Sequence, residues 1–201
     1  MIDGVPVGQR AFESLRSAVD AVVVSVRRRD SDLARFAIAN GAAVVVLGDA
    51  PGLTANASGM GNSLSAAAWV ALDAYPQAPW WIVALADMPW VQADTVHAIV
   101  AYAQTICPNG AHENANANAN VNVNARASAH AIVRPRYRGT PGHPIALSRS
   151  LGAELRACSG DIGAREIIQR YREHLHWLDV ADPGVTLDVD LPTDLQSFRS
   201  P

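Results

Sequence analysis

Residues 80–91, WWIVALADMPWV, set an aspartate directly behind an apolar run, and this stretch decides how we interpret the fold. The run 80–86 is short and continuously apolar, which predicts a buried strand. A carboxylate at the end of such a strand must be solvated, bonded to backbone N–H groups or used to hold a ligand. In open α/β sheets ligands bind beyond the carboxyl ends of the strands, so Asp87 is the first candidate functional residue. The structural alternative is an aspartate that caps a helix or bonds a loop.

Strand-like and helix-like segments alternate along the chain. Apolar stretches rich in β-branched residues predict strands, and stretches with helical spacing of apolar residues predict helices. The expected strands are 21–26, 42–47, 80–86, 129–135 and 175–180, and the expected helices are 6–18, 31–40, 61–75, 92–105, 148–158 and 162–171, with a last short helix from Pro192. The alternation predicts an α/β fold with a mostly parallel sheet and helices on both faces. The loops 48–61 and 138–143 are expected to line the same edge as Asp87.

The composition indicates one domain without a charged binding surface. The chain has 201 residues, of which 49% are hydrophobic, and a net charge of −3, which argues against nucleic acid as a partner. No apolar run reaches the roughly 18–20 residues of a membrane span, and no targeting sequence is visible, so we expect no membrane partner and a cytoplasmic location. Cys107 and Cys158 are far apart and are expected to be free thiols. All 16 basic residues are arginines.

Residues 108–128 interrupt the pattern with asparagine that alternates with alanine or valine. Such a low-complexity tract offers little apolar surface to bury, and the cost of closing a loop grows only slowly with its length. We expect a disordered insertion that the fold tolerates. The alternative is a β-prone, self-associating tract.

The stretch GMGNSL, residues 59–64, describes a glycine-rich loop that leads into a helix. Free N–H groups and the helix dipole at such a start favour an anionic or polar ligand. The structural alternative is capping by Asn62 or Ser63, which explains the same residues without a ligand.

Two further motifs carry residues that suit a substrate: YRGTPGHPIAL, residues 137–147, and GDIGAR, residues 160–165. In the first, Gly142 allows close approach to the backbone, and His143 can orient or hydrogen-bond a ligand. In the second, the helix start or Arg165 is a candidate for phosphate. The alternatives are a structural histidine, and an N-cap Asp161 with an i,i+4 ion pair to Arg165.

The stretch LDVDLPTDL, residues 187–195, carries alternating acids. Asp188 and Asp190 are expected to point to opposite sides of an extended segment, so only one of them would share a metal with Asp87. Solvated turn acids are the structural alternative.

Taken in order, the motifs G-M-G-x-S-L, L-A-D-M-P, G-x-x-G-H-P, G-D-x-G-A-R and D-x-D-x-P-x-D-L resemble those of the MobA-like nucleotidyltransferases. Among these, the molybdenum cofactor cytidylyltransferase branch is the most similar, and the resemblance runs from Asp3 to Leu195. It implies a single three-layer, Rossmann-like domain over residues 1–201. It also implies Mg²⁺-dependent transfer of a nucleoside monophosphate, CMP ahead of GMP, from a nucleoside triphosphate to a phosphorylated acceptor such as molybdopterin cofactor.

The resemblance also implies a role for each candidate residue. Asp87 and Asp190 would be the catalytic residues and the Mg²⁺ ligands, with Asp188 as the alternative second ligand. The nucleotide would contact Gly59, Gly61 and Ser63, and the acceptor would contact Gly142, His143, Asp161 and Arg165. Such a site suits this chemistry, because phosphoryl-type transfer depends mostly on positioning and on neutralising charge.

The sequence departs from the family at its start. Members open with a strand and the glycine-rich loop L-A-A-G-x-S-x-R-M-G-x-x-K before a D-G-x-P segment, and residues 3–6, DGVP, resemble that later segment. The resemblance therefore implies an N-terminally truncated domain that lacks its first, central strand, the loop around the triphosphate and the family's lysine. Two alternatives to an active enzyme follow. One is an inactive domain that binds the cofactor, a molybdoenzyme or its chaperone, and the other is a poorly folding gene remnant or a chain with a misassigned start.

Overall fold

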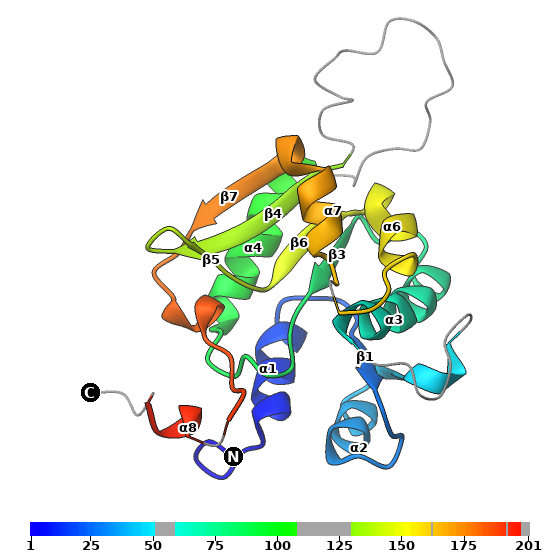
Figure 1. Ribbon diagram of the computed structural model, residues 1–201, viewed down its shortest axis with the longest axis vertical. Helices are drawn as coiled ribbons and strands as arrows, with labels where there is room; N and C mark the ends of the chain where they lie inside the picture. The colour runs from blue at the N-terminus through cyan, green and yellow to red at the C-terminus, as the bar shows by residue number, and fades with distance from the viewer. Residues whose placement is uncertain (51–58, 108–129, 162, 192, 198–201) are drawn as a thin grey trace, which may run out of the picture.

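A computed structural model of the chain describes residues 1–50, 59–107, 130–161, 163–191 and 193–197. The insertion expected at 108–128 lies outside the described residues. The described strands form two separate sheets, and helices pack around both of them (Figure 1).

The first sheet is small and parallel. Its part of the chain contains α1 (Val7–Arg16), β1 (Val23–Val26), α2 (Asp32–Ala39), β2 (Ala43–Val46), the 3-10 turn η1 (Leu47–Asp49) and α3 (Met60–Ala74). β1 and β2 pair in register, with Val23 beside Ala43. The Ser31 hydroxyl caps α2 by accepting a hydrogen bond from the Ala34 N–H at 3.2 Å.

The second sheet is larger and mixed. Its part of the chain contains β3 (Trp80–Val83), α4 (Ala93–Ile106), β4 (Ile132–Tyr137), β5 (Thr140–Pro141), β6 (Ile145–Ser148), η2 (Arg149–Leu151), α6 (Gly152–Arg156), α7 (Arg165–Arg170), η3 (Arg172–His174), β7 (Leu175–Asp179), η4 (Pro183–Thr186) and α8 (Asp194–Ser197). The strand order is β3-β6-β4-β5, and β7 pairs with β4 in addition, in the parallel direction.

The α/β class is confirmed, but the prediction of a mostly parallel sheet is wrong. β6 runs antiparallel to both β3 and β4, and only β1–β2 and β4–β7 are parallel pairs. The cause is a tight turn at Arg138 and Gly139, which both have positive φ angles. A short turn can only join antiparallel strands, whereas parallel strands need a long crossover. The glycines and prolines of residues 139–144 indicate a turn in the sequence, so the buried strand β6 that follows them is not predicted.

Helices cover both faces of the mixed sheet. On one face, Ile132, Ile145 and Leu147 pack against residues of α3, α6 and α7. On the other face, Val133 and Ala146 pack against Ile99 and Ala103 of α4. The core of the molecule therefore lies around β4 and β6, between two helical layers.

The two sheets are held together by helices and not by strand pairing. Within the described chain, β1 pairs only with β2, and β3 pairs only with β6. The surroundings of Gly8 in α1 show how β1 and β3 are oriented relative to each other. A Cβ atom built at Gly8 would lie 3.2 Å from the Leu33 side chain and 3.7 Å from the Ala86 carbonyl oxygen. Leu33 follows β1 and Ala86 follows β3, so the carboxyl ends of both strands lie on the same side of the molecule.

Candidate functional site

Asp87 lies beyond the carboxyl end of β3, and the residue is exposed. The two residues that follow it, Met88 and Pro89, are buried. Met88 packs in a small cluster with Val91 and Val96 at the start of α4. The buried neighbours fix the loop, while Asp87 itself remains accessible to a ligand.

A C-terminal segment, residues 182–190, brings two more carboxylates to Asp87. The Val189 N–H donates a hydrogen bond to the backbone oxygen of Asp87 at 2.9 Å, and the exposed Asp188 and Asp190 flank Val189. Although the residue is exposed, partial desolvation of its carboxylate and the negative charges of Asp188 and Asp190 raise the pKa of Asp87, while a backbone hydrogen bond to its carboxylate acts against them. The charge of Asp188 acts more strongly than that of Asp190. Both carboxylates therefore act electrostatically on Asp87, and which of them would share a metal with it stays a prediction.

The third acid of this motif has a structural role. The Asp194 carboxylate accepts hydrogen bonds from the backbone N–H groups of Asp190 and Leu191 at 3.0 and 2.7 Å. These bonds satisfy backbone donors just before α8 and hold the turn that carries Asp190.

The start of α3 packs directly on the turn at residues 159–161. The Gly61 N–H donates to the Gly160 carbonyl oxygen at 2.8 Å, and a Cβ atom at Gly59 or Gly61 would overlap the backbone of this turn. Gly59 also has a φ angle of 98°, which favours glycine. Packing of backbone on backbone therefore explains both glycines. The Ser63 hydroxyl, one turn into α3, donates to the Gly59 carbonyl oxygen at 3.3 Å.

The turn at Gly142 and His143 packs on the 182–190 segment. The His143 N–H donates to the Val185 carbonyl oxygen at 2.8 Å, and a Cβ atom at Gly142 would overlap that same oxygen. The Nδ1 atom of His143 is buried without a hydrogen-bond partner. Burial and the nearby Arg134 guanidinium lower the pKa of His143 to about 4, so its imidazole is neutral near pH 7.

Asp161 and Arg165 are both exposed at the start of α7. The N-cap of this helix is Ala164, which makes no side-chain cap, and no ion pair joins Asp161 to Arg165 in the described structure. Neither part of the structural alternative for this motif is therefore observed, and both charges are accessible.

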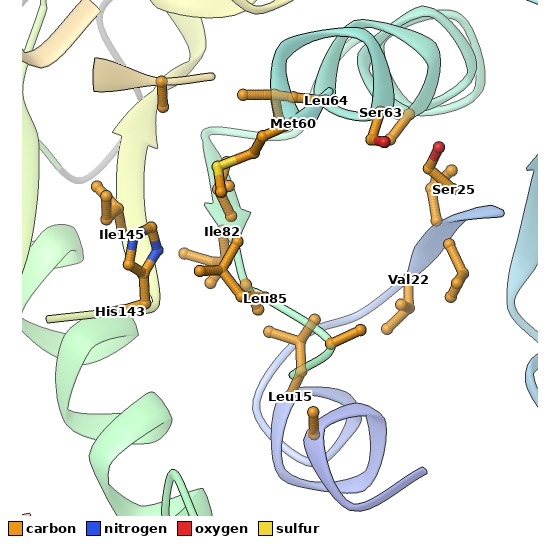
Figure 2. A pocket seen from close by; sticks show the side chains of 18 of the residues that line it. Leu15, Val22, Ser25, Met60, Ser63, Leu64, Ile82, Leu85, His143 and Ile145 are labelled. Carbon is orange, nitrogen blue, oxygen red and sulfur yellow. The ribbon is translucent and has the colours of Figure 1, made fainter. Parts of the chain in front are cut away.

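A cavity of about 840 Å³ lies between β1 and β3 (Figure 2). Figure 2 shows Val22 and Ser25 on the β1 side and Ile82 and Leu85 on the β3 side, with α1 and α3 closing the space between them. The predicted site residues among its lining are Ser63, His143, Asp161 and Arg165. The structure thus brings together residues from α3, the 142–143 turn and the start of α7.

The remaining predicted residues lie outside this lining. Gly59, Gly61 and Gly142 pack into backbone, as described above. Asp87 and Asp190, together with Asp188, form what we call the acidic group. It lies beside the cavity, because Ala86, the residue before Asp87, is part of the lining. Within the described ranges, no three His, Cys, Asp or Glu side chains form a ready metal-binding cluster.

Sequence reasoning misses two charged residues that shape the site. Arg134 lines the cavity and donates from Nε to the Gly142 carbonyl oxygen at 3.1 Å. Asp182 is buried and binds the start of α4 through its carboxylate. The available signals are an arginine inside the apolar run AIVRP, residues 131–135, and the turn sequence DPG, residues 182–184.

The cysteine prediction is confirmed, because Cys107 and Cys158 are free thiols. Among the described helices, none is both long and apolar enough to cross a membrane.

The fold is similar to that of several solved structures. Rv0371c from Mycobacterium tuberculosis H37Rv, solved in complex with manganese, is 24% identical over 98% of this chain and 88% of its own, with a TM-score of 0.65. Its homologue from Mycobacterium sp. strain JC1 is 22% identical over 98% and 83%, with a TM-score of 0.64. A nucleotidyl transferase from Methanothermobacter thermautotroptrophicus is 17% identical over 99% and 81%, with a TM-score of 0.67. At these identities the likeness shows the fold alone.

The family of the chain is shown by its sequence and not by these structures. No curated protein matches the chain. The model of the MobA-like NTP transferase domain, however, matches residues 1–175, which is most of the chain. The resemblance of the five motifs is confirmed at this level. The chain therefore belongs to the family of MobA-like NTP transferase domains.

Proposed function

We propose that the chain is a Mg²⁺-dependent nucleotidyltransferase of the cytoplasm that transfers a nucleoside monophosphate, CMP ahead of GMP, to a phosphorylated acceptor of the molybdopterin type. One observation carries the proposal: in a MobA-like chain, Asp87 stands at the carboxyl end of β3 with two further carboxylates close enough to raise its pKa. An oxygen of the acceptor phosphate attacks the α-phosphorus, the bond to the bridging β-phosphate oxygen breaks, and pyrophosphate leaves.

The acidic group fits a hard divalent cation. Mg²⁺ prefers carboxylate oxygens, keeps several waters and needs only one or two protein carboxylates besides the substrate phosphates. We propose Asp87 and Asp190 as ligands. The stronger effect of Asp188 on Asp87 supports Asp188 as the alternative, and single Asp→Asn variants at the two positions distinguish them. Rv0371c was solved with manganese, which supports a divalent metal in this fold. When bound, the cation would neutralise phosphate charge during the transfer.

The cavity residues are proposed to bind the two substrates. Gly59, Gly61 and Ser63 at the start of α3 are assigned to the nucleotide, and Gly142, His143, Asp161 and Arg165 to the acceptor. Arg165 suits a phosphate, because its exposed guanidinium can form paired charge-assisted hydrogen bonds. A neutral His143 in the lining of the cavity suits a hydrogen bond to an uncharged ligand group.

The second candidate function is non-catalytic binding of the cofactor, or of a molybdoenzyme or its chaperone. It is favoured by the open cavity between β1 and β3, which leaves one edge of each of these strands unpaired within the described sheets.

The test is pyrophosphate release by the purified chain with CTP or GTP, molybdopterin cofactor and Mg²⁺. We expect release that depends on the metal and falls at least about 100-fold in Asp87→Asn, because the cation loses its main ligand. Asp73→Asn is the matched control, since Asp73 pairs with Arg156 at the far end of α3. Saturable cofactor binding without release would favour the non-catalytic function. Release that Asp87→Asn leaves unchanged would contradict the proposed site.

A further inference from the structure

Asp182 is a buried carboxylate that is only 4% exposed. Its Oδ2 atom accepts hydrogen bonds from the Gln92 N–H at 2.9 Å and from the Thr95 hydroxyl at 2.8 Å, both at the start of α4. Its Oδ1 atom accepts from the Gly184 N–H at 2.8 Å. A buried carboxylate is costly unless donors surround its oxygens, and here three donors do so. One side chain therefore joins α4 to the beginning of the 182–190 segment.

The same segment then touches both groups of site residues. Its Val185 carbonyl oxygen accepts from the His143 N–H at 2.8 Å, and its Val189 N–H donates to the Asp87 carbonyl oxygen at 2.9 Å. Asp182 is the one acid of this segment whose carboxylate is buried. The segment is thus anchored at its beginning by Asp182 and ends beside Asp87.

We propose that Asp182 is a positioning residue for the metal site. By fixing where the 182–190 segment begins, it sets where the carboxylates of Asp188 and Asp190 lie relative to Asp87, and thereby the affinity of the acidic group for a divalent cation. The inference rests on the proposed function, because it concerns the same metal site. Asp182 itself contacts neither metal nor substrate.

The physical reason is the cost of losing this carboxylate. A buried donor left without a partner is costly, so the segment would shift until water reached the donors. Ligands must be held within about 0.5 Å of the geometry that binds, so a small shift at the anchor weakens the site. The same shift would weaken the hydrogen bond from the Val189 N–H to the Asp87 carbonyl oxygen, and this weakening can be measured in the metal-free protein.

The experiment compares Asp182→Asn with Thr95→Val. In Asp182→Asn the amide keeps one oxygen that accepts hydrogen bonds, but its NH₂ group replaces the other oxygen and faces a group that also donates. Thr95→Val removes only the hydroxyl partner and leaves the bond to Gly184 in place. Mn²⁺ is the probe, and free Mn²⁺ is measured by electron paramagnetic resonance. In the metal-free variants, hydrogen exchange of the Val189 N–H is measured by NMR.

We expect Asp182→Asn to weaken Mn²⁺ binding about tenfold or more, as losing the support of a metal ligand does elsewhere. We expect faster exchange of the Val189 N–H in the same variant. Thr95→Val should lower the melting temperature but leave both readouts near wild type. If Asp182 only stabilised the fold, Asp182→Asn would likewise lower the melting temperature and leave both readouts near wild type. If Asp182→Asn does not fold, Asp182→Ser is measured instead, because its hydroxyl can still accept the Gly184 N–H.

Unchanged Mn²⁺ affinity together with unchanged Val189 exchange in the Asp182 variant would overturn the inference. If wild-type protein binds no Mn²⁺, the proposed metal site fails. The exchange of the Val189 N–H then still decides whether Asp182 positions the segment, so the two failures are distinguishable.

Discussion

Asp87 couples the chemistry of the site to the stability of the fold. Its raised pKa means that the folded state holds this proton more tightly than the unfolded chain, so ionisation of Asp87 destabilises the fold above that pKa. The effect disappears below the unfolded pKa of about 3.9. We expect Asp87→Asn to raise the melting temperature at neutral pH and to leave it unchanged near pH 3, as measured by circular dichroism. A lower melting temperature of the variant at neutral pH would contradict this account.

His143 gives the opposite pH dependence. Burial and the Arg134 charge lower its pKa from 6.5 to about 4, so the unfolded chain binds more protons than the folded one within this window. Stability is expected to fall as the pH drops from about 6.5 to about 4, by up to about 3 kcal/mol from this residue. Urea unfolding across this range should show a flatter pH dependence for His143→Gln than for wild type. Parallel curves for the two proteins would assign the acid sensitivity to other groups.

At the residue scale, the sequence predicts what depends on local pattern. Asp87 could be located because an apolar run stops on it, and the free cysteines because of their spacing. Asp182 could not, since its burial depends on hydrogen bonds to the start of α4, which is far away in sequence. The need for glycine at 61 and 142 comes from backbones that meet only in the folded chain.

At the scale of elements, two buried helical glycines provide a matched comparison. A Cβ atom at Gly61 would overlap the backbone of Ser159, whereas one at Gly152 would overlap the flexible side chain of Leu72. Alanine is normally favoured over glycine in a helix by about 1 kcal/mol. We expect Gly61→Ala to destabilise by about 2 kcal/mol or more, because backbone must move, and Gly152→Ala to be close to neutral. Chemical denaturation measures both, and equal losses would show that Leu72 cannot yield.

Elements were predictable where their period was uninterrupted. The positions of α1 to α4 and of β1 to β3 follow from apolar spacing, with ends that differ by a few residues. β6 was not predictable, because the prolines and glycines around it indicate a turn. Strand direction was not predictable either, since it is set by the tight turn at Arg138 and Gly139 and not by composition.

At the scale of the whole molecule, the two sheets should differ in local stability. The β1–β2 sheet is joined to the rest by helices, whereas β4 has strand partners on both sides. We expect amides of β1 and β2 to exchange with deuterium at least about tenfold faster than those of β4, because partial opening of the small sheet breaks no ladder of the large one. Equal protection of β1 and β4 would show instead that the molecule opens as a single unit.

The cavity between β1 and β3 also bears on how the protein behaves when it is heated. Unpaired strand edges readily pair with strands of other molecules, and here α1 and α3 shelter them. Once either helix loosens, two edges become accessible together, and association between molecules will compete with refolding. Thermal denaturation is therefore expected to be irreversible and to start at a lower temperature in concentrated samples, with transitions that depend on the heating rate.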